Sequence, residues 1–345
     1  MLSQRRPPMR QTVLLTGVTG FIARRIALDL LNAGHTVRGS LRSAARGGGV
    51  RDGLRPHLDD PAALERLSFV ELDLADDAGW DAAMAGVDTL MHTASPFPMR
   101  QPEDEDQIIR PAVDGTRRAL TAAAAAGVGR VVLTSSMVAV MHTDAPEGRA
   151  VTEDDWTDPA HRTANAYVRS KTLAERAAWE IAEAHPDMSL IAINPGLVLG
   201  RPVDDAYGTS LAVIERIMAA KDPMQPDVGF PVVHLSDVSA LHLAALDTPA
   251  MAGHRHLAAE SFWTMPEIAR LLTETYPDRR IKTGTAPGWM LRVLALFDRE
   301  VRTVLPTVGF RVAIDPAPTE ARAGHRMIPA RDAILEAAAF IAAKG

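Results

Sequence analysis

Residues 12–33 read TVLLTGVTGFIARRIALDLLNA, and this stretch decides the fold. The apolar run Thr12–Thr16 predicts a buried strand, and the amphipathic run Ile22–Ala33 predicts a helix directly after a glycine-rich turn. Gly17 and Gly20 permit a tight turn, so that the pyrophosphate of a dinucleotide can approach the helix N-terminus. For this motif taken alone, a glycine-rich turn without a ligand remains the alternative.

The first 195 residues alternate short apolar runs with helical patterns, which is typical of a right-handed parallel α/β sheet. Further strands are expected at Thr36–Leu41, Leu67–Leu72, Thr89–Thr93, Arg130–Ser135 and Ser189–Asn194. Alanine-rich and amphipathic stretches predict long helices at Ile108–Ala126 and Ala166–Ala184. The expected fold class is α/β, a Rossmann-type doubly wound parallel sheet with a smaller, mostly helical C-terminal substrate lobe.

The regular pattern loosens after Gly200, where prolines break the chain and helices without regular strands are expected. We therefore expect a flexible tail at residues 1–10 and a nucleotide-binding domain at residues 11–200, to which residues 232–246 return. Residues 201–231 and 247–345 are expected to form the substrate lobe. The lobe should cover the carboxyl edge of the sheet, where open α/β sheets bind ligands. The Gly- and Arg-rich segment Ser43–Pro56 is expected to be a mobile loop.

The second expected strand ends in basic residues. NAD enzymes usually place an acid here to hold the ribose 2′-hydroxyl, whereas this chain has Arg38 and Arg42 with Ser40 between them. Guanidinium groups suit a 2′-phosphate through charge-assisted, forked hydrogen bonds, so NADP(H) is the expected cofactor. Solvated surface arginines are the alternative in this arginine-rich chain. After the third strand, Asp73 either accepts from the adenine amino group or caps a helix near Asp76.

Tyr167 and Lys171 lie one turn apart on the same face of an expected helix. A tyrosine near its reference pKa of about 10 is an adequate acid but a poor base at neutral pH. A neighbouring ammonium would lower that pKa, and the same lysine can hold the nicotinamide ribose. With three tyrosines and four lysines in the chain, chance gives this spacing at about 3%. Ser136, after the fifth strand, can donate to a substrate oxygen while Tyr167 protonates it.

The composition favours a small-molecule partner. A net charge of −6 gives no general attraction to nucleic acid or to anionic membranes, and no run approaches the about 20 apolar residues of a membrane span. The chain has no cysteine, and its 11 histidines lack metal-binding spacing, so no metal site is expected. The basic N-terminus lacks a signal peptide's long apolar region, so a cytoplasmic location is expected. A monomer and a homodimer both remain open.

Four segments together resemble the extended short-chain dehydrogenases/reductases: TGVTGFIA at 16–23, TSS at 134–136, YVRSK at 167–171 and NPGLVLG at 194–200. The resemblance is to the dihydroflavonol reductase-like and cinnamoyl-CoA reductase-like NADPH carbonyl reductases, and it covers about residues 11–245. It implies Ser136, Tyr167 and Lys171 as the catalytic residues. It also implies transfer of a hydride from the nicotinamide to a carbonyl carbon.

Together with the glycine loop and the arginines, the resemblance gives a set of expected ligand contacts. Cofactor contacts are expected from Gly17, Thr19, Gly20, Phe21, Ile22, Arg38, Arg42, Asp73, Leu74, Thr93, Ala94, Ser95, Thr134, Tyr167, Lys171, Pro195, Leu197 and Val198. Substrate contacts are expected from Ser95, Phe97, Ser136, Met137, Tyr207 and Met224. The apolar and aromatic members of the second group favour an apolar or aromatic carbonyl compound.

Some positions need separate interpretation. Ala23 replaces the third glycine of the loop, which is common in this branch of the family. Asp114 stands where relatives usually have asparagine, so a water-mediated proton relay through that position is in doubt. Asp237 matches an acid that these proteins often carry, and its expected role is structural.

Two other functions remain open from the sequence. An NAD-dependent nucleotide-sugar epimerase would share the fold and the Tyr/Lys pair. Dehydratases of the same fold place two carboxylates directly after the serine or threonine, where this chain has Met137 and Val138. The third possibility is a non-catalytic NADP-binding regulator, although such proteins typically lose the Tyr/Lys pair.

Overall fold

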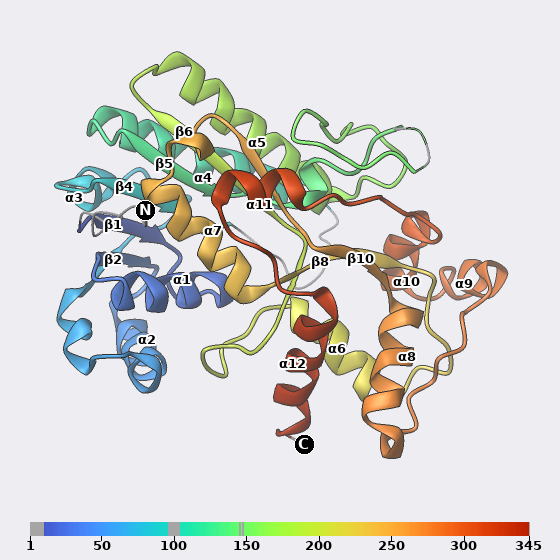
Figure 1. The fold of residues 1–345 in the computed structure, drawn as a ribbon. Helices are drawn as coiled ribbons and strands as arrows, with labels where there is room; N and C mark the ends of the chain where they lie inside the picture. The colour runs from blue at the N-terminus through green and yellow to red at the C-terminus, as the bar shows by residue number, and fades with distance from the viewer. Residues whose placement is uncertain (1–9, 96–103, 145, 147, 345) are drawn as a thin grey trace, which may run out of the picture.

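The computed structural model describes residues 10–95, 104–144, 146 and 148–344, and its centre is a seven-stranded parallel sheet (Figure 1). The strands are β1 (Thr12–Thr16), β2 (Thr36–Leu41), β3 (Leu67–Glu71), β4 (Thr89–His92), β5 (Arg130–Thr134), β6 (Ser189–Pro195) and β9 (Arg255–Ala258). Their order is β3-β2-β1-β4-β5-β6-β9, so the direction of winding reverses between β1 and β4. Ligands of this fold bind outside the carboxyl ends of the strands at that reversal. The expected Rossmann-type sheet is confirmed.

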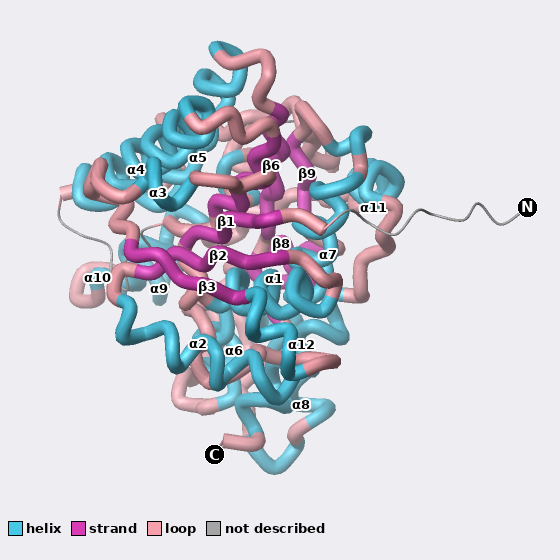
Figure 2. The backbone as a smooth tube through the Cα atoms, turned by 90° about the vertical axis from the view of Figure 1, so that its left-hand side faces the viewer, coloured by secondary structure: helices cyan, strands magenta, loops and turns pink. Residues whose placement is uncertain are grey.

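Helices cover both faces of this sheet (Figure 2). The helices of the first domain are α1 (Phe21–Asn32), α2 (Gly47–Leu54), α3 (Trp80–Met84), α4 (Asp106–Ala125), α5 (Ala166–Ala184) and α7 (Leu235–Asp247). On one face α1 packs against α7, and on the other α4 packs against α5. Two separate clusters of buried apolar side chains fill these layers, one around Ile26 and Leu241 and the other around Leu90 and Leu120. Both faces of the sheet are therefore shielded from solvent, which explains the nearly continuous apolar character of the strands.

The part of the chain outside the seven-stranded sheet and its covering helices forms a second body, which contains its own small sheet as well as helices. The strands β7 (Leu197–Leu199), β8 (Gly229–His234) and β10 (Ser261–Thr264) form it in the order β10-β8-β7. The helices are α6 (Ser210–Met218), α8 (Met265–Thr275), α9 (Gly288–Leu294), α10 (Arg299–Val304), α11 (Ala317–Ala323) and α12 (Ala330–Ala342). A cluster that includes Ile214, Leu272 and Ile334 joins α6, α8 and α12. The expectation that this region lacks regular strands is wrong.

Two further expectations about elements are corrected by the structure. The segment 43–56 is not an irregular loop, because Val50 and Leu54 are buried and fold residues 47–54 into α2. Residues 255–258, assigned to the lobe from the sequence, form the edge strand β9 and pair with β6. Within residues 232–246, α7 packs on α1, whereas residues 232–234 belong to β8 in the smaller sheet.

None of the helices within the described ranges is both long and apolar enough to cross a membrane. Of the expected N-terminal tail, residues 1–9 lie outside the described residues.

Candidate active site

The turn between β1 and α1 is held in place by the ends of two neighbouring strands. Gly17 has φ +69°, and its amide donates to Ser40 Oγ at 3.1 Å, while the amide of Val18 donates to Ser40 O at 3.0 Å. A Cβ on Gly17 would lie 3.0 Å from Ala94 Cβ at the end of β4. The first glycine is therefore required by both backbone conformation and space. Ser40 is buried and holds this turn rather than facing a ligand.

The N-terminus of α1 fits the pyrophosphate of a dinucleotide. Gly20 is its N-cap, and among the described residues no side chain caps the helix; its first turn carries no acid. Uncapped amides and the positive end of the helix dipole attract phosphate groups. Thr19, Phe21 and Ile22 lie half-buried at this end, close to the carboxyl ends of β1 and β4.

The two arginines of β2 have different surroundings. Arg42 is exposed directly after the carboxyl end of β2, on the side where the 2′-phosphate of NADP would lie. Arg38 lies in the middle of the strand, and its guanidinium donates to the carbonyls of Ala83 and Ala85 at 2.7 and 2.8 Å. It therefore ties β2 to the end of α3. The expectation that Arg38 holds the 2′-phosphate is not supported by this geometry, and Arg42 remains the candidate.

Asp73 and Leu74 follow β3 at the same edge. Asp73 is exposed and accepts from the amide of Ala75 at 2.9 Å, so it caps a turn. The helix expected near Asp76 is not found there, because α3 begins only at Trp80. The carbonyl of Leu74 accepts from Arg118 at 2.7 Å. The remaining acceptor capacity of the Asp73 carboxylate is open to a ligand.

The end of β4 is held by a chain of hydrogen bonds that fixes the tautomer of His92. Thr16 Oγ1 accepts from the amides of Thr93 and Ala94 at 3.1 and 3.0 Å, and it lies 3.0 Å from His92 Nδ1. Because two amides occupy the lone pairs of this hydroxyl, it donates to Nδ1 and leaves the proton of His92 on Nε2. Burial lowers the pKa of His92 to about 3, with a smaller contribution from the charge of Lys171, so the ring is neutral.

Tyr167 lies in the first turn of α5 because Asn165 caps the helix there. The Asn165 side chain accepts from the amide of Val168 at 3.0 Å, and Tyr167 is the second helical residue. Lys171 follows one turn later and is buried. The positive end of a 19-residue helix favours negative charge, so this position favours a phenolate when Tyr167 gives up its proton.

Ser136 and Tyr167 are joined by a hydrogen bond between their side chains. Ser136 follows β5, is buried, and lies with its Oγ 3.5 Å from the carbonyl of Pro195. Burial raises the pKa of Tyr167, and the hydrogen bond with Ser136 lowers it in part. In the protein without a bound cofactor, burial and Ser136 therefore determine the pKa of Tyr167, and the expected lowering of this pKa by Lys171 is not found.

Lys171 lies against the carboxyl ends of β4 and β5. It lines a cavity of about 10 Å³, comparable to the space that one water molecule needs, together with His92, Ser95, Thr116 and Ser135. Burial lowers the pKa of Lys171 to about 8, while the negative charge of Glu175 raises it. The amine is therefore mostly an ammonium at neutral pH. The structure thus brings Ser136, Tyr167 and Lys171 together beside the glycine turn.

The comparison with known families agrees with this arrangement. Residues 13–258 match the NAD dependent epimerase/dehydratase family, which is most of the chain. The chain belongs to this family. It comprises the extended short-chain dehydrogenases/reductases, so the resemblance noted in the sequence is confirmed.

Within the family, similar proteins are reductases. Cinnamoyl-CoA reductase 1 of Arabidopsis thaliana is 33% identical over 280 residues, 80% of this chain and 78% of that protein. Dihydroflavonol 4-reductase of Zea mays is 30% identical over 273 residues, 77% of this chain and 75% of that protein. The structure of Gre2 from Candida albicans in complex with NADPH has a TM-score of 0.79 at 25% identity and covers 96% of this chain and 99% of that chain.

The remaining cofactor residues expected for the family lie around the same edge. Thr134 Oγ1 is 2.7 Å from His242 Nε2, and His242 Nδ1 is 2.7 Å from the carbonyl of Val238. Since a carbonyl only accepts, Nδ1 carries the proton and Thr134 donates its hydroxyl hydrogen to Nε2. Leu197 is half-buried, whereas the side chain of Val198 is in the hydrophobic core, so only its backbone is available to a ligand.

The expected substrate residues are not all free to meet a ligand. Ser95 is half-buried at the end of β4, and Phe97 lies outside the described residues. Met137 is buried in a cluster with Val140, which argues against a direct substrate contact. Tyr207 donates to Glu215, so its hydroxyl is engaged within the second body. Ser95, Ser136 and the half-buried Met224 remain candidates for contact.

Two acids of special interest have clear positions. Asp114 is exposed on α4, and with Asp77, Arg117 and Arg118 it lines a shallow groove between α3 and α4. Lys171 is not among the residues that line this groove, so a relay through the Asp114 side chain is not supported. The buried Asp237 accepts from His325 Nε2 and from the amide of Ile328 at 2.8 and 2.9 Å. Asp237 therefore anchors α7 to the C-terminal segment, as expected of a structural residue.

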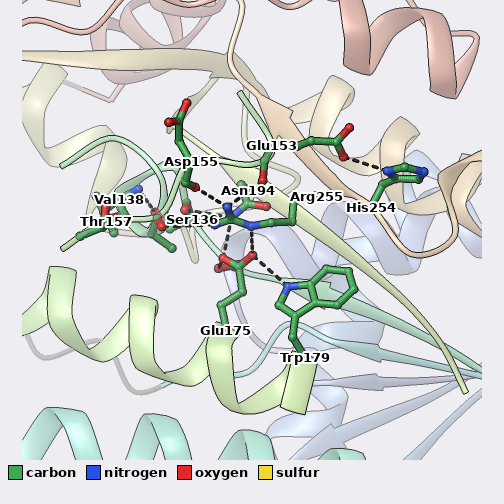
Figure 3. Close-up of polar contacts among 12 residues, drawn as sticks. Ser136, Val138, Glu153, Asp155, Thr157, Glu175, Trp179, Asn194, His254 and Arg255 are labelled. Carbon is green, nitrogen blue, oxygen red and sulfur yellow. Dashed lines mark hydrogen bonds and ion pairs between the residues drawn. The ribbon is translucent and has the colours of Figure 1, made fainter. Parts of the chain in front are cut away.

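Sequence reasoning missed the polar residues behind the catalytic group. Glu175, Asn194 and Arg255 form a buried hydrogen-bonded group beside Ser136 (Figure 3). The signal for Glu175 was present, because it follows Lys171 by one helical turn. Arg255 is distant in sequence from this motif, and no local pattern could reveal its partner.

Proposed function

We propose that this chain reduces the carbonyl group of an aldehyde or ketone with NADPH, and oxidises the corresponding alcohol in the reverse direction. The observation that carries the proposal is the hydrogen-bonded pair Ser136–Tyr167 beside the buried ammonium of Lys171. This group lies at the carboxyl edge of the sheet, next to an uncapped helix N-terminus that suits a dinucleotide. The similar proteins named as cinnamoyl-CoA and dihydroflavonol reductases support the same chemistry.

NADPH, when bound, supplies the hydride. Ser136 and Tyr167 bind the carbonyl oxygen of the substrate, and their hydroxyl groups polarise it. Tyr167 then gives its proton to the developing alkoxide. The ammonium of Lys171 and the positive end of α5 stabilise the phenolate that remains. In the reverse direction the same phenolate accepts a proton from an alcohol.

The epimerase alternative is less well supported than the reductase. The similar proteins described above are reductases, although the family model includes epimerases and dehydratases. Met137 and Val138 occupy the positions at which dehydratases carry two carboxylates. A non-catalytic regulator would not need a tyrosine, a serine and a lysine held together at the ligand edge. Met137 is buried and the Tyr207 hydroxyl is hydrogen-bonded within the protein, so these two residues no longer support an apolar or aromatic substrate. We therefore propose only the chemical class of the substrate, an aldehyde or a ketone.

A Tyr167→Phe substitution tests the proposal. The variant keeps the ring and its packing but removes the proton donor, so turnover should fall about 10²- to 10⁴-fold, the usual contribution of a general acid. NADPH affinity should stay within about threefold of the wild type, since the phenol is not proposed to hold the phosphates. The assay is a screen at 340 nm with NADPH and NADH against varied aldehydes and ketones. Wild-type turnover in the variant would refute the assignment of Tyr167.

A further inference from the structure

The carboxylate of Glu175 lies at the centre of the buried polar group behind the catalytic residues (Figure 3). The residue is 1% exposed, and its carboxylate receives hydrogen bonds from the residue after β5, from the strands β6 and β9, and from its own helix. The Oε2 atom accepts from Ser135 Oγ after β5 and from Asn194 Nδ2 on β6, at 2.5 and 2.7 Å. The Oε1 atom accepts from Arg255 Nε on β9 at 2.6 Å and from Trp179 Nε1 on α5 at 3.4 Å.

These four donors fix the charge of Glu175. An ionised carboxylate has about four lone-pair positions, and each is met here by an N–H or O–H donor. Neutralisation comes from the Arg255 guanidinium, which also donates to the carbonyls of Glu153 and Ala139 and lies 3.8 Å from the centre of the Trp156 ring. A buried carboxylate with these partners is an anion, because its desolvation is offset by a cation and by hydrogen bonds.

The same carboxylate acts on both catalytic groups. Asn194 Nδ2, held by Glu175, also donates to the carbonyl of Ser136 at 3.2 Å and so fixes the backbone that carries the catalytic hydroxyl. On α5, Glu175 is one turn after Lys171, on the same face of the helix. Its negative charge raises the pKa of Lys171 against the effect of burial.

We propose that Glu175 is a positioning residue of this site, which orders the strand ends around Ser136 and supplies the negative charge that keeps Lys171 an ammonium, while Arg255 neutralises Glu175 from the far side. The inference rests on the proposed function only for its effect on turnover. Other titratable groups near Lys171 are Tyr167 on its own helix and His92 on β4. The low pKa of His92 keeps that ring neutral, so among these described groups Glu175 is the anion that acts on Lys171.

Opposite substitutions in the Glu175–Arg255 pair test the proposal. Glu175→Gln removes the anion and should lower the pKa of Lys171 by at least about half a unit. Arg255→Met removes the counter-charge, but Ser135, Asn194 and Trp179 still donate to the carboxylate and should keep it ionised. The uncompensated anion should then raise the pKa of Lys171. The double variant should return it toward the wild-type value, because it removes both charges together. Glu180→Gln is the matched control, since Glu180 is an exposed glutamate on the same helix and should leave the pKa unchanged.

The pKa of Lys171 can be measured directly by NMR of lysines labelled with ¹³C and ¹⁵N. The chain has four lysines, so Lys171→Arg assigns the relevant signal by its disappearance. This titration requires no turnover, and it therefore separates failure of this inference from failure of the reductase proposal. A parallel pH profile of kcat/KM should show the alkaline limb moving in the same direction as the lysine signal.

The two substitutions also separate positioning from simple stabilisation. A purely structural role predicts lower thermal stability in both variants with no change in the Lys171 titration, and that outcome would overturn the proposal. Shifts in the same direction for Glu175→Gln and Arg255→Met would overturn it as well. If Glu175→Gln does not fold, an upward shift in Arg255→Met supports the proposal, and an unchanged or lowered pKa in that variant refutes it.

Discussion

Replacing Arg42 with alanine should weaken the preference for NADPH over NADH. Arg42 is exposed after the carboxyl end of β2, so its guanidinium can reach the 2′-phosphate from solvent, with no partner among the described residues to displace. A hydrogen bond to a charged group contributes about 1.5–3 kcal/mol, which corresponds to about 10- to 150-fold in affinity. Because the side chain is exposed, the lower end applies, and we expect about a tenfold rise in the KM for NADPH.

The control for this prediction is the other arginine of the strand. Arg38 donates to the carbonyls of Ala83 and Ala85, so Arg38→Ala should reduce stability while leaving the ratio of kcat/KM for NADPH and NADH within about twofold. The assay is initial-rate kinetics at 340 nm with both cofactors and one carbonyl substrate. A ratio that changes less than threefold in Arg42→Ala, or as much in Arg38→Ala, would show that the 2′-phosphate is held elsewhere.

Two predictions concern stability. Asp237→Ala should lower the free energy of unfolding in urea by about 3 kcal/mol, because it leaves the Ile328 amide and His325 without their charged acceptor. The control Asp247→Ala changes an exposed aspartate and should lower it by less than about 1 kcal/mol. Equal losses in the two variants would contradict this prediction. Burial lowers the pKa values of His92, His142 and His242 to about 3, 4 and 4, so these rings stay neutral in the folded state. The unfolded chain binds protons on them below the reference pKa of about 6.5, so stability should fall from pH 6.5 toward pH 4 by up to about 1.4 kcal/mol per pH unit for each histidine. A urea midpoint that does not change between pH 7 and pH 5 would contradict that estimate.

The sequence predicted the elements whose signals are local. The six expected strands are found with ends that differ by at most one residue, because each is a short apolar run buried on both faces. The helix Ala166–Ala184 was predicted with both ends correct, since Asn165 provides a cap and the helix carries a long buried face. Tyr167 and Lys171 could be recognised for the same reason, as their spacing alone places them on one side of a helix.

What the sequence could not reveal depends on contacts between distant segments. Residues 47–54 include Gly47, Gly48 and Gly49, which are poor helix formers, and only the burial of Val50 and Leu54 makes them helical. Arg38 and Arg42 follow the same strand alternation, yet the position of α3 decides that Arg38 is engaged. The strand β9 has four residues and pairs with a partner about sixty positions earlier, a distance at which periodicity carries no information.

Because of the edge strand β9, the two bodies are not separate, continuous segments of the sequence. Between β6 and β9 the polypeptide passes through the second body, then returns to complete the sheet and deliver the Arg255 side chain. A shortened version ending near residue 245 would keep the glycine turn, Tyr167 and Lys171, but not the cation below them. Anyone who transplants the lobe from a relative to alter substrate range must therefore leave residues 255–258 with the host sheet. A graft whose junction follows sequence similarity alone would cut through the active-site support.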